Sequence, residues 1–369
     1  MKSYQTRISK PNIPPNVILK IQRILKSGNL ASGELVEKLE QSLSRFLNIS
    51  YCINLSNGTA ALHTALKSLE IGPDDEVITS PFTFISSASS ILMAGAKPVF
   101  ADIEERTFLI DPAEIKKRTT KKTKAIIVVD LFGQMADYQK IHSLVKNKGI
   151  FIIQDACQAL GAKQGQNSIG YLADLTILSF YATKLIAAGE GGALLTNNRR
   201  LAQKAKIFSH LGFNPKNPEK IYEIGFNYRM TEIQAAILLS QLPKIEKILK
   251  QRVENVQYLN QKLSSIEGIV TPLVEDQNFH TFSQYTIKVK KPYPLTRNQL
   301  LKKFIEAKIE AKVYYPLPLH LQPLFDNLGY KKGDLPNAEK AANEVLSLPV
   351  HSSVTKEELN KIIDIVKTI

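Results

Sequence analysis

Short apolar runs alternate with longer stretches of helical periodicity through the middle of this 369-residue chain. The runs that read as buried strands are 51–55, 76–79, 98–102, 125–131, 151–155, 175–180 and 192–196, and helical stretches between them include 59–69, 86–94 and 136–148. Strands that alternate with helices build a mostly parallel sheet covered on both faces. We therefore predict an α/β fold whose ligands gather at the carboxyl ends of the strands.

The regions on either side of this alternation differ from it. The first 50 residues contain two helical stretches, 17–26 and 34–47. A long helical stretch begins at Met230 and ends near Leu263, with a break expected near Pro243. After it, the expected strands are 285–289 and 311–314, and the expected helices are 297–307, 338–346 and 356–367. The predicted organisation is an N-terminal helical segment (1–50), a large α/β domain (51–245) and a smaller α+β domain (246–369).

Lys184 lies between the apolar run 175–178 and the cluster Gly189-Glu190-Gly191-Gly192. Another apolar run, 151–154, leads directly into Asp155, and Gln158 follows one turn later. A lysine that can form a Schiff base and a buried carboxylate that can protonate a pyridine nitrogen are what pyridoxal phosphate (PLP) requires of a protein. Partial burial would lower the lysine pKa and leave more neutral amine for imine formation. Lys163, the local alternative, lies in a polar, turn-like stretch, so we predict PLP bound through Lys184.

A candidate phosphate site lies where the first strand passes into a helix. Gly58 lets the backbone approach an anion, and the helix start that follows offers free N–H groups and the positive end of the helix dipole. The hydroxyls of Thr59 and Ser179 can add donors, although a helix cap with a turn glycine explains the same residues. Phe84 can lie against the cofactor ring, or it can be an ordinary core aromatic.

The charge and the cysteines indicate the kind of protein. A formal net charge of +14 and a pI of about 9.5 raise nucleic-acid binding as an alternative, but the basic residues are scattered and form no stripe interleaved with aromatics. Cys52 and Cys157 lie in apolar contexts typical of reduced cysteines. The N-terminus lacks an apolar signal core, and no apolar run approaches the roughly 20 residues of a membrane span. We expect a cytoplasmic protein with no nucleic-acid partner, no membrane contact and no metal site.

Several motifs follow one another in order between about Asn29 and the C-terminus. They are Ser56-Asn57-Gly58-Thr59, Leu131-Phe132-Gly133-Gln134, Asp155-Ala156-Cys157-Gln158, the run from Ser179 to Lys184, Gly189-Glu190-Gly191-Gly192, and the segments 225–232 and 315–320. Together they resemble the DegT-type (DegT/DnrJ/StrS) family of PLP-dependent sugar aminotransferases. The resemblance implies the aspartate-aminotransferase-like fold (fold type I) and a homodimer with active sites at the subunit interface.

The same resemblance implies roles for individual residues. Lys184 would carry the Schiff base, Asp155 would pair with the ring nitrogen and Gln158 would contact the ring oxygen. Phe84 would stack on the ring, and the phosphate would be held by Gly58, Thr59 and Ser179. Relatives that dehydrate sugars carry histidine in place of the lysine, so Lys184 indicates a transaminase. One departure is the apolar segment 185–188, where relatives often carry a polar residue.

Three further residues are implied on the substrate side. Asn227 would reach across from the partner subunit, and Tyr314 and His320 fall where the family places substrate-binding residues. For His320 the alternative is a loop histidine packed among prolines.

The resemblance also implies a reaction. An amino group would move from an amino acid, with glutamate or glutamine as the expected donor, to a nucleotide-linked keto-sugar. The segments 189–192 and 227–232 resemble the branch acting on 4-keto sugars more than the 3-keto branch. Keto-inositol aminotransferases and a non-catalytic regulator that keeps the fold are the alternatives. A nicotinamide-dependent oxidoreductase would need a glycine fingerprint such as G-x-G-x-x-G, which the stretch 56–61 lacks.

Overall fold

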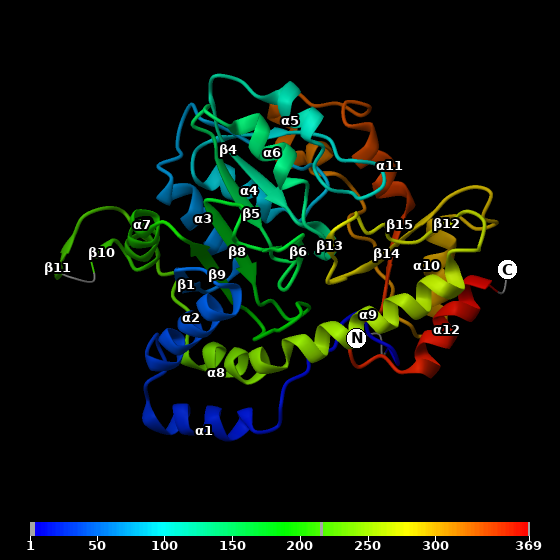
Figure 1. Cartoon of the computed structure of the whole chain (residues 1–369), viewed down its shortest axis with the longest axis horizontal. Coiled ribbons are helices and arrows are strands. Elements are labelled where there is room, and N and C mark those ends of the chain that lie inside the picture. The colour runs from blue at the N-terminus through cyan, green and yellow to red at the C-terminus, as the bar shows by residue number, and fades with distance from the viewer. Residues whose placement is uncertain (1–3, 215–216, 368–369) are drawn as a thin grey trace.

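A seven-stranded sheet forms the centre of the computed structural model, which describes residues 4–214 and 217–367 (Figure 1). Its strands are β1 (Tyr51–Leu55), β2 (Glu76–Thr79), β3 (Lys97–Phe100), β4 (Thr123–Val129), β5 (Phe151–Asp155), β8 (Leu175–Ser179) and β9 (Gly192–Thr196). Their order is β1-β9-β8-β5-β4-β2-β3, and β9 runs in the opposite direction to the other six strands. This mostly parallel sheet confirms the predicted α/β fold.

The helices of this part of the chain pack on the sheet or on one another. They are α1 (Val17–Ser27), α2 (Glu34–Leu47), α3 (Gly58–Ser68), α4 (Ser86–Met93), α5 (Pro112–Arg118), α6 (Tyr138–Val145), α7 (Arg199–Ser209) and α8 (Glu232–Gln241), with a 3-10 turn at Leu131–Gly133. Helix α3 packs against β8 and β9, and α2 packs against β1. Leu39, Leu62 and Ile153 are fully buried in the resulting core.

Two helices connect this core with a second one. Helix α8 and helix α9 (Ile245–Leu263) are joined by a 3-10 turn at Leu242–Lys244 that contains Pro243, which confirms the predicted break. Figure 1 shows them running beneath the sheet from α2 toward the C-terminal part of the chain. Ile248 of α9 belongs to the large core and Leu259 to the second core.

The second core surrounds a small antiparallel sheet with the order β12-β14-β15. Its elements are β12 (Ile269–Val270), β14 (Tyr285–Val289), β15 (Val345–Leu348), α10 (Arg297–Glu306) and α12 (Lys356–Lys367). One prediction is wrong here, and another is right about the helix but not about where it ends. The expected strand 311–314 contributes only an isolated bridge between Lys312 and Ser347, and the expected helix 338–346 is α11 (Pro336–Glu344), which ends before β15. The buried run 345–348 pairs in register with β14, and this tertiary pairing overrides its helical periodicity.

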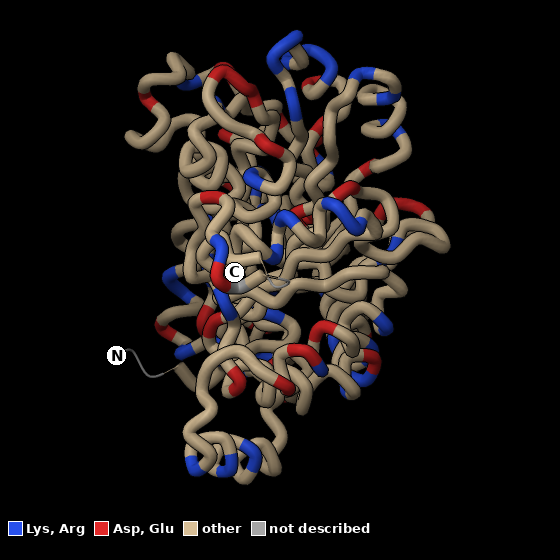
Figure 2. The backbone as a smooth tube through the Cα atoms, turned by 90° about the vertical axis from the view of Figure 1, so that its left-hand side faces the viewer, with Lys and Arg blue, Asp and Glu red and all other residues tan. Residues whose placement is uncertain are grey.

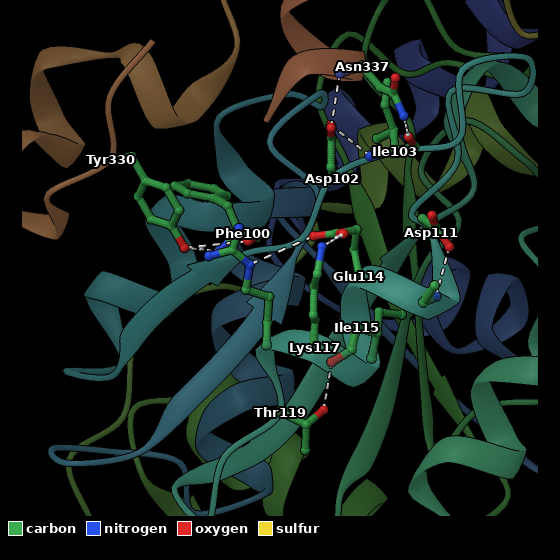
Figure 3. Close-up of polar contacts among 12 residues, drawn as sticks. Phe100, Asp102, Ile103, Asp111, Glu114, Ile115, Lys117, Thr119, Tyr330 and Asn337 are labelled. Atoms are coloured by element: carbon green, nitrogen blue, oxygen red, sulfur yellow. Dashed lines mark hydrogen bonds and ion pairs between the residues drawn. The ribbon is translucent and has the colours of Figure 1, made fainter. Parts of the chain in front are cut away.

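Residues 319–337, which follow α10 in the chain and end in α11, return to the large sheet and cover its edge strand β3 (Figure 3). This segment contains 3-10 turns at Leu319–Leu321 and Pro323–Leu328. The hydroxyl of Tyr330 accepts a hydrogen bond from the Phe100 amide at 2.9 Å, and the Asp102 carboxylate accepts one from the Asn337 amide at 2.9 Å. Covering an edge strand protects it from pairing with other chains.

Five short strands complete the fold. A three-stranded sheet contains β13 (Asn278–Phe279), β6 (Lys163–Gln164) and β7 (Asn167–Ser168), and β10 (Phe213–Asn214) pairs with β11 (Asn217–Ile221). Within residues 4–214 and 217–367, no helix combines the length and apolar character needed to cross a membrane.

Candidate active site

A cavity of about 780 Å³ lies at the carboxyl ends of β5 and β8. Strand ends and the start of α3 contribute to its lining, as do the segment that leads into α4 and the residues Lys312, Tyr314 and Tyr315. The predicted site residues that line it are Gly58, Thr59, Phe84, Asp155, Gln158, Ser179, Lys184 and Tyr314. The structure therefore brings together residues that are up to about 250 positions apart, as is usual for strand-end sites.

The start of α3 forms one end of the cavity. Asn57 caps the helix by accepting a hydrogen bond from the Ala60 amide at 2.8 Å. A β-carbon on Gly58 would lie 3.2 Å from both the Cys157 sulfur and the Ser179 β-carbon, so only glycine fits there without displacing a neighbour. The Thr59 hydroxyl lies 2.6 Å from that of Ser86. These hydroxyls and the positive end of the 11-residue helix suit an anion such as a phosphate.

The glycine cluster after Lys184 supports this end of the cavity. A β-carbon on Gly192 in β9 would overlap the carbonyl oxygen of Asn57. Glycine at this position therefore lets the strand pass directly beside the backbone that begins α3.

Asp155 lies at the end of β5 and is buried. Its Oδ2 atom accepts a hydrogen bond from the Ser87 hydroxyl at 2.8 Å, and its Oδ1 atom accepts one from the Cys157 amide at 3.2 Å. An ionised carboxylate has about four acceptor positions, so capacity remains for a donor in the cavity. Phe84 lines the same cavity with 56% of its surface exposed, which leaves its ring free to contact a ligand.

Lys184 follows β8 in a tight segment. Its amide donates to the carbonyl of Tyr181 at 2.9 Å, and Gln241 of α8 bonds both the amide and the carbonyl of Ala187. Burial lowers the pKa of the Lys184 ammonium group, against the opposing effects of Cys157 and Asp155. A lowered pKa leaves more neutral amine at a given pH, which a nucleophilic lysine requires. Leu185, Ile186 and Ala187 are buried in the core. Packing therefore explains why the segment 185–188 is apolar where relatives often carry a polar residue.

Gln158 is held by two partners at the side of the cavity. Its Oε1 atom accepts a hydrogen bond from the Phe132 amide at 3.1 Å, and its Nε2 atom donates to the Tyr315 hydroxyl at 3.2 Å. Burial raises the pKa of Tyr315, so its hydroxyl stays protonated. No periodicity marks Tyr315, Ser86 or Ser87 as part of the site.

Two predicted residues lie outside this cavity. Asn227 is exposed, and its side-chain oxygen accepts a hydrogen bond from Arg229 Nε at 3.0 Å. His320 is only 1% exposed, and its Nε2 atom lies 3.2 Å from Glu339 Oε1. Burial lowers the pKa of His320, with Glu339 opposing the shift. Within one chain, the geometry gives neither residue a contact with a ligand in the cavity.

The cavity residues fit PLP. Gly58 and the start of α3 provide space and donors for a phosphate, Asp155 offers a carboxylate to a ring nitrogen, and Lys184 offers an amine of lowered pKa. Among the described residues, no group of three or more His, Cys, Asp or Glu side chains could hold a metal ion.

Lys and Arg are interspersed with Asp and Glu over the face shown in Figure 2.

Comparisons with known proteins point to the same chemistry. The model of the DegT/DnrJ/EryC1/StrS aminotransferase family matches residues 11–367. The pleiotropic regulatory protein of Geobacillus stearothermophilus is 41% identical over 355 residues, covering 95% of this chain and 94% of that protein. The UDP-2-acetamido-2-deoxy-3-oxo-D-glucuronate aminotransferase of Pseudomonas aeruginosa is 35% identical over 353 residues, which cover 95% of this chain and 94% of that protein.

A solved structure agrees in fold over nearly the whole chain. Spr1654 of Streptococcus pneumoniae in its PLP form superposes with a TM-score of 0.92 at 28% identity, covering 98% of this chain and 97% of that one. The fold is therefore that of fold type I aminotransferases. The chain belongs to the DegT/DnrJ/EryC1/StrS aminotransferase family and is a PLP-dependent aminotransferase.

Proposed function

We propose that this aminotransferase moves an amino group from glutamate or glutamine to a keto-sugar linked to a nucleotide, in the cytoplasm. The observation that carries the proposal is the meeting of Lys184, Asp155 and Gly58 in one cavity that Tyr314 also lines. The Pseudomonas aeruginosa relative, whose name contains a nucleotide-linked 3-oxo sugar, supports this class of acceptor. The segments 189–192 and 227–232 resemble the 4-keto branch, so we propose a 4-keto sugar in preference to a 3-keto sugar.

Five residues of the cavity have a defined task in this proposal. PLP, when bound, supplies an electron sink that stabilises negative charge on the α-carbon of the amino donor. The Nζ atom of Lys184 removes the proton from that α-carbon, because its lowered pKa lets it act as a base. Asp155 holds a proton at the ring nitrogen, and the Thr59 and Ser179 hydroxyls bind the phosphate. Phe84 covers one face of the ring and excludes water from it.

We infer that the active form is a homodimer in which Asn227 serves the partner's cavity. Asn227 is exposed and lies outside the cavity of its own chain. Close to it, Ile221, Tyr222 and Ile224 expose 64%, 60% and 85% of their surfaces, near the β10–β11 pair that extends from the body in Figure 1. Exposed apolar side chains that are grouped together are typical of a protein–protein contact.

A panel of acceptors tests the proposed substrate. The purified enzyme, loaded with PLP, is offered glutamate or glutamine with 4-keto nucleotide sugars, 3-keto nucleotide sugars and keto-inositols, and the amino product is identified by mass spectrometry. We expect turnover of nucleotide-linked 4-keto sugars. Turnover of the 3-keto sugar alone would show that the proposed 4-keto position is wrong. Turnover of a keto-inositol alone would show that the substrate is not a nucleotide-linked sugar.

The relative named as a pleiotropic regulatory protein makes a regulatory role the second candidate. A regulator that only keeps the fold would bind PLP without exchanging amino groups. Transfer of nitrogen-15 from labelled glutamate to enzyme-bound PLP in the absence of any sugar would exclude that candidate.

A further inference from the structure

Two adjacent serines at the start of α4 contact two different residues of the cavity lining. Ser86 and Ser87 are both buried, with 8% and 1% of their surfaces exposed. The Ser86 hydroxyl lies 2.6 Å from the hydroxyl of Thr59, at the end of the cavity where α3 begins. The Ser87 hydroxyl lies 2.8 Å from Oδ2 of Asp155, at the end of β5.

The usual task of a serine at a helix start does not explain this pair. A serine there normally caps the helix by accepting a hydrogen bond from a backbone amide. The N-cap of α4 is Ile85, and no side chain caps the helix. Both serine hydroxyls instead contact residues that we assign to cofactor binding.

The direction of the hydrogen bonds at Ser87 follows from the chemistry of its partners. An ionised carboxylate only accepts, so the Ser87 hydroxyl donates to Asp155. The Thr83 hydroxyl, 3.2 Å from that of Ser87, must then donate to it. With the Cys157 amide on its other oxygen, the Asp155 carboxylate is held in one plane, and its remaining acceptor positions are fixed relative to the cavity.

The contact between Ser86 and Thr59 acts where α3 begins. When the Ser86 hydroxyl donates to that of Thr59, the Thr59 hydroxyl keeps its own hydrogen free for an acceptor in the cavity. Phe84 lies in the same turn, since the Ser87 amide donates to the Phe84 carbonyl at 3.2 Å. One turn of chain therefore carries Phe84, which we assign to the ring face, and two hydroxyls that contact Thr59 and Asp155 of the cavity lining.

We propose that the first turn of α4 is a positioning element for PLP: Ser87 orients the Asp155 carboxylate toward the ring nitrogen, and Ser86 orients the Thr59 hydroxyl toward the phosphate. This inference rests on the assignment of Asp155 and Thr59 in the proposed function. Neither serine itself needs to touch the reacting atoms. The two act through their neighbours, in the way that outer contacts orient the ligands of a metal.

The test uses Ser87→Ala, Ser86→Ala and the matched control Ser89→Ala, which alters the same helix at a half-buried position outside the cavity lining. For Ser87→Ala we expect the absorption spectrum of bound PLP, followed as a function of pH, to change and kcat to fall roughly tenfold, because a hydrogen bond to a charged group is lost. For Ser86→Ala we expect the dissociation constant of PLP to rise roughly tenfold with the spectrum unchanged. Ser87→Thr keeps the hydroxyl and should restore the spectrum.

Two outcomes separate this inference from the site assignment. If Asp155→Asn alters the spectrum of bound PLP while Ser87→Ala and Ser86→Ala behave like Ser89→Ala, the positioning role is wrong and the assignment of Asp155 stands. If Asp155→Asn also leaves the spectrum unchanged, the assignment of Asp155 is wrong and the inference is overturned with it. Circular dichroism confirms that each variant is folded.

Discussion

A β-carbon on Gly58 would lie 3.2 Å from the β-carbon of Ser179, although the two residues are more than 100 positions apart in the sequence. This close approach brings the start of α3 against the end of β8. The proposed phosphate site is therefore built from two elements, and they can pack this closely because Gly58 has no side chain.

Gly58→Ala should therefore weaken PLP binding. The added methyl group needs a displacement of Cys157 or Ser179, and overpacking of this kind costs about 1–3 kcal/mol. We expect the PLP dissociation constant, measured by fluorescence titration, to rise roughly tenfold. Gly72→Ala is the matched control, because a β-carbon on Gly72 has no neighbour within 4 Å. Equal PLP affinity in both variants would show that the phosphate lies elsewhere.

Tyr314 and His320 should respond differently to substitution. Tyr314 lines the cavity, so Tyr314→Phe should raise the KM for the keto-sugar and leave the stability of the fold unchanged. His320 is buried against Glu339, so His320→Asn should lower the free energy of unfolding by about 1–3 kcal/mol and leave that KM unchanged. Urea unfolding and steady-state kinetics on both variants measure the difference. A raised KM in His320→Asn, with normal stability, would show that His320 binds the substrate and that its contact with Glu339 is not its main role.

Mixed dimers test whether Asn227 acts across the subunit interface. Lys184→Ala and Asn227→Ala subunits are each expected to be inactive alone. After they are unfolded together and refolded, the mixed dimer contains one cavity with an intact Lys184 and a partner's intact Asn227. Random association should restore about a quarter of the wild-type activity. No recovered activity, with mixed dimers present by native mass spectrometry, would mean that Asn227 does not act in trans.

Buried histidines should make the protein sensitive to acid. Burial lowers the pKa of His280 to about 3 and that of His351 to about 4, from 6.5. Between pH 6.5 and about 4 the unfolded chain thus binds more protons than the folded one, and stability falls as the pH falls. At pH 5 each histidine should lower the free energy of unfolding by about 2 kcal/mol relative to neutral pH.

The variant His280→Asn measures how much of this loss of stability at low pH comes from His280. The amide oxygen can replace Nδ1 as acceptor for the Phe282 amide, which lies 2.9 Å away. Urea midpoints at pH 7.5 and pH 5 should differ less in this variant than in the wild type. An unchanged difference would show that His280 does not titrate on unfolding.

The parts of the site that the sequence could predict are those that follow a strand. Asp155 and Ser179 each end an apolar run, and the carboxyl ends of neighbouring strands meet at one edge of the sheet. His320 follows no such pattern, because its position depends on packing against Glu339 in α11. Ser87 was not recognisable either, since a serine at a helix start normally caps the helix. The short strand β15 escaped prediction because its pairing with β14 is decided by tertiary contact.

The attachment point of PLP tests the central claim most directly. The holoenzyme is reduced with borohydride and digested, and the peptide that carries the pyridoxyl group is identified by mass spectrometry. We predict that the label lies on Lys184, that Lys184→Ala remains unlabelled and loses transaminase activity, and that Lys163→Ala, altered at an exposed position outside the cavity lining, behaves as the wild type. A label on any other lysine, or full activity in Lys184→Ala, would contradict the account.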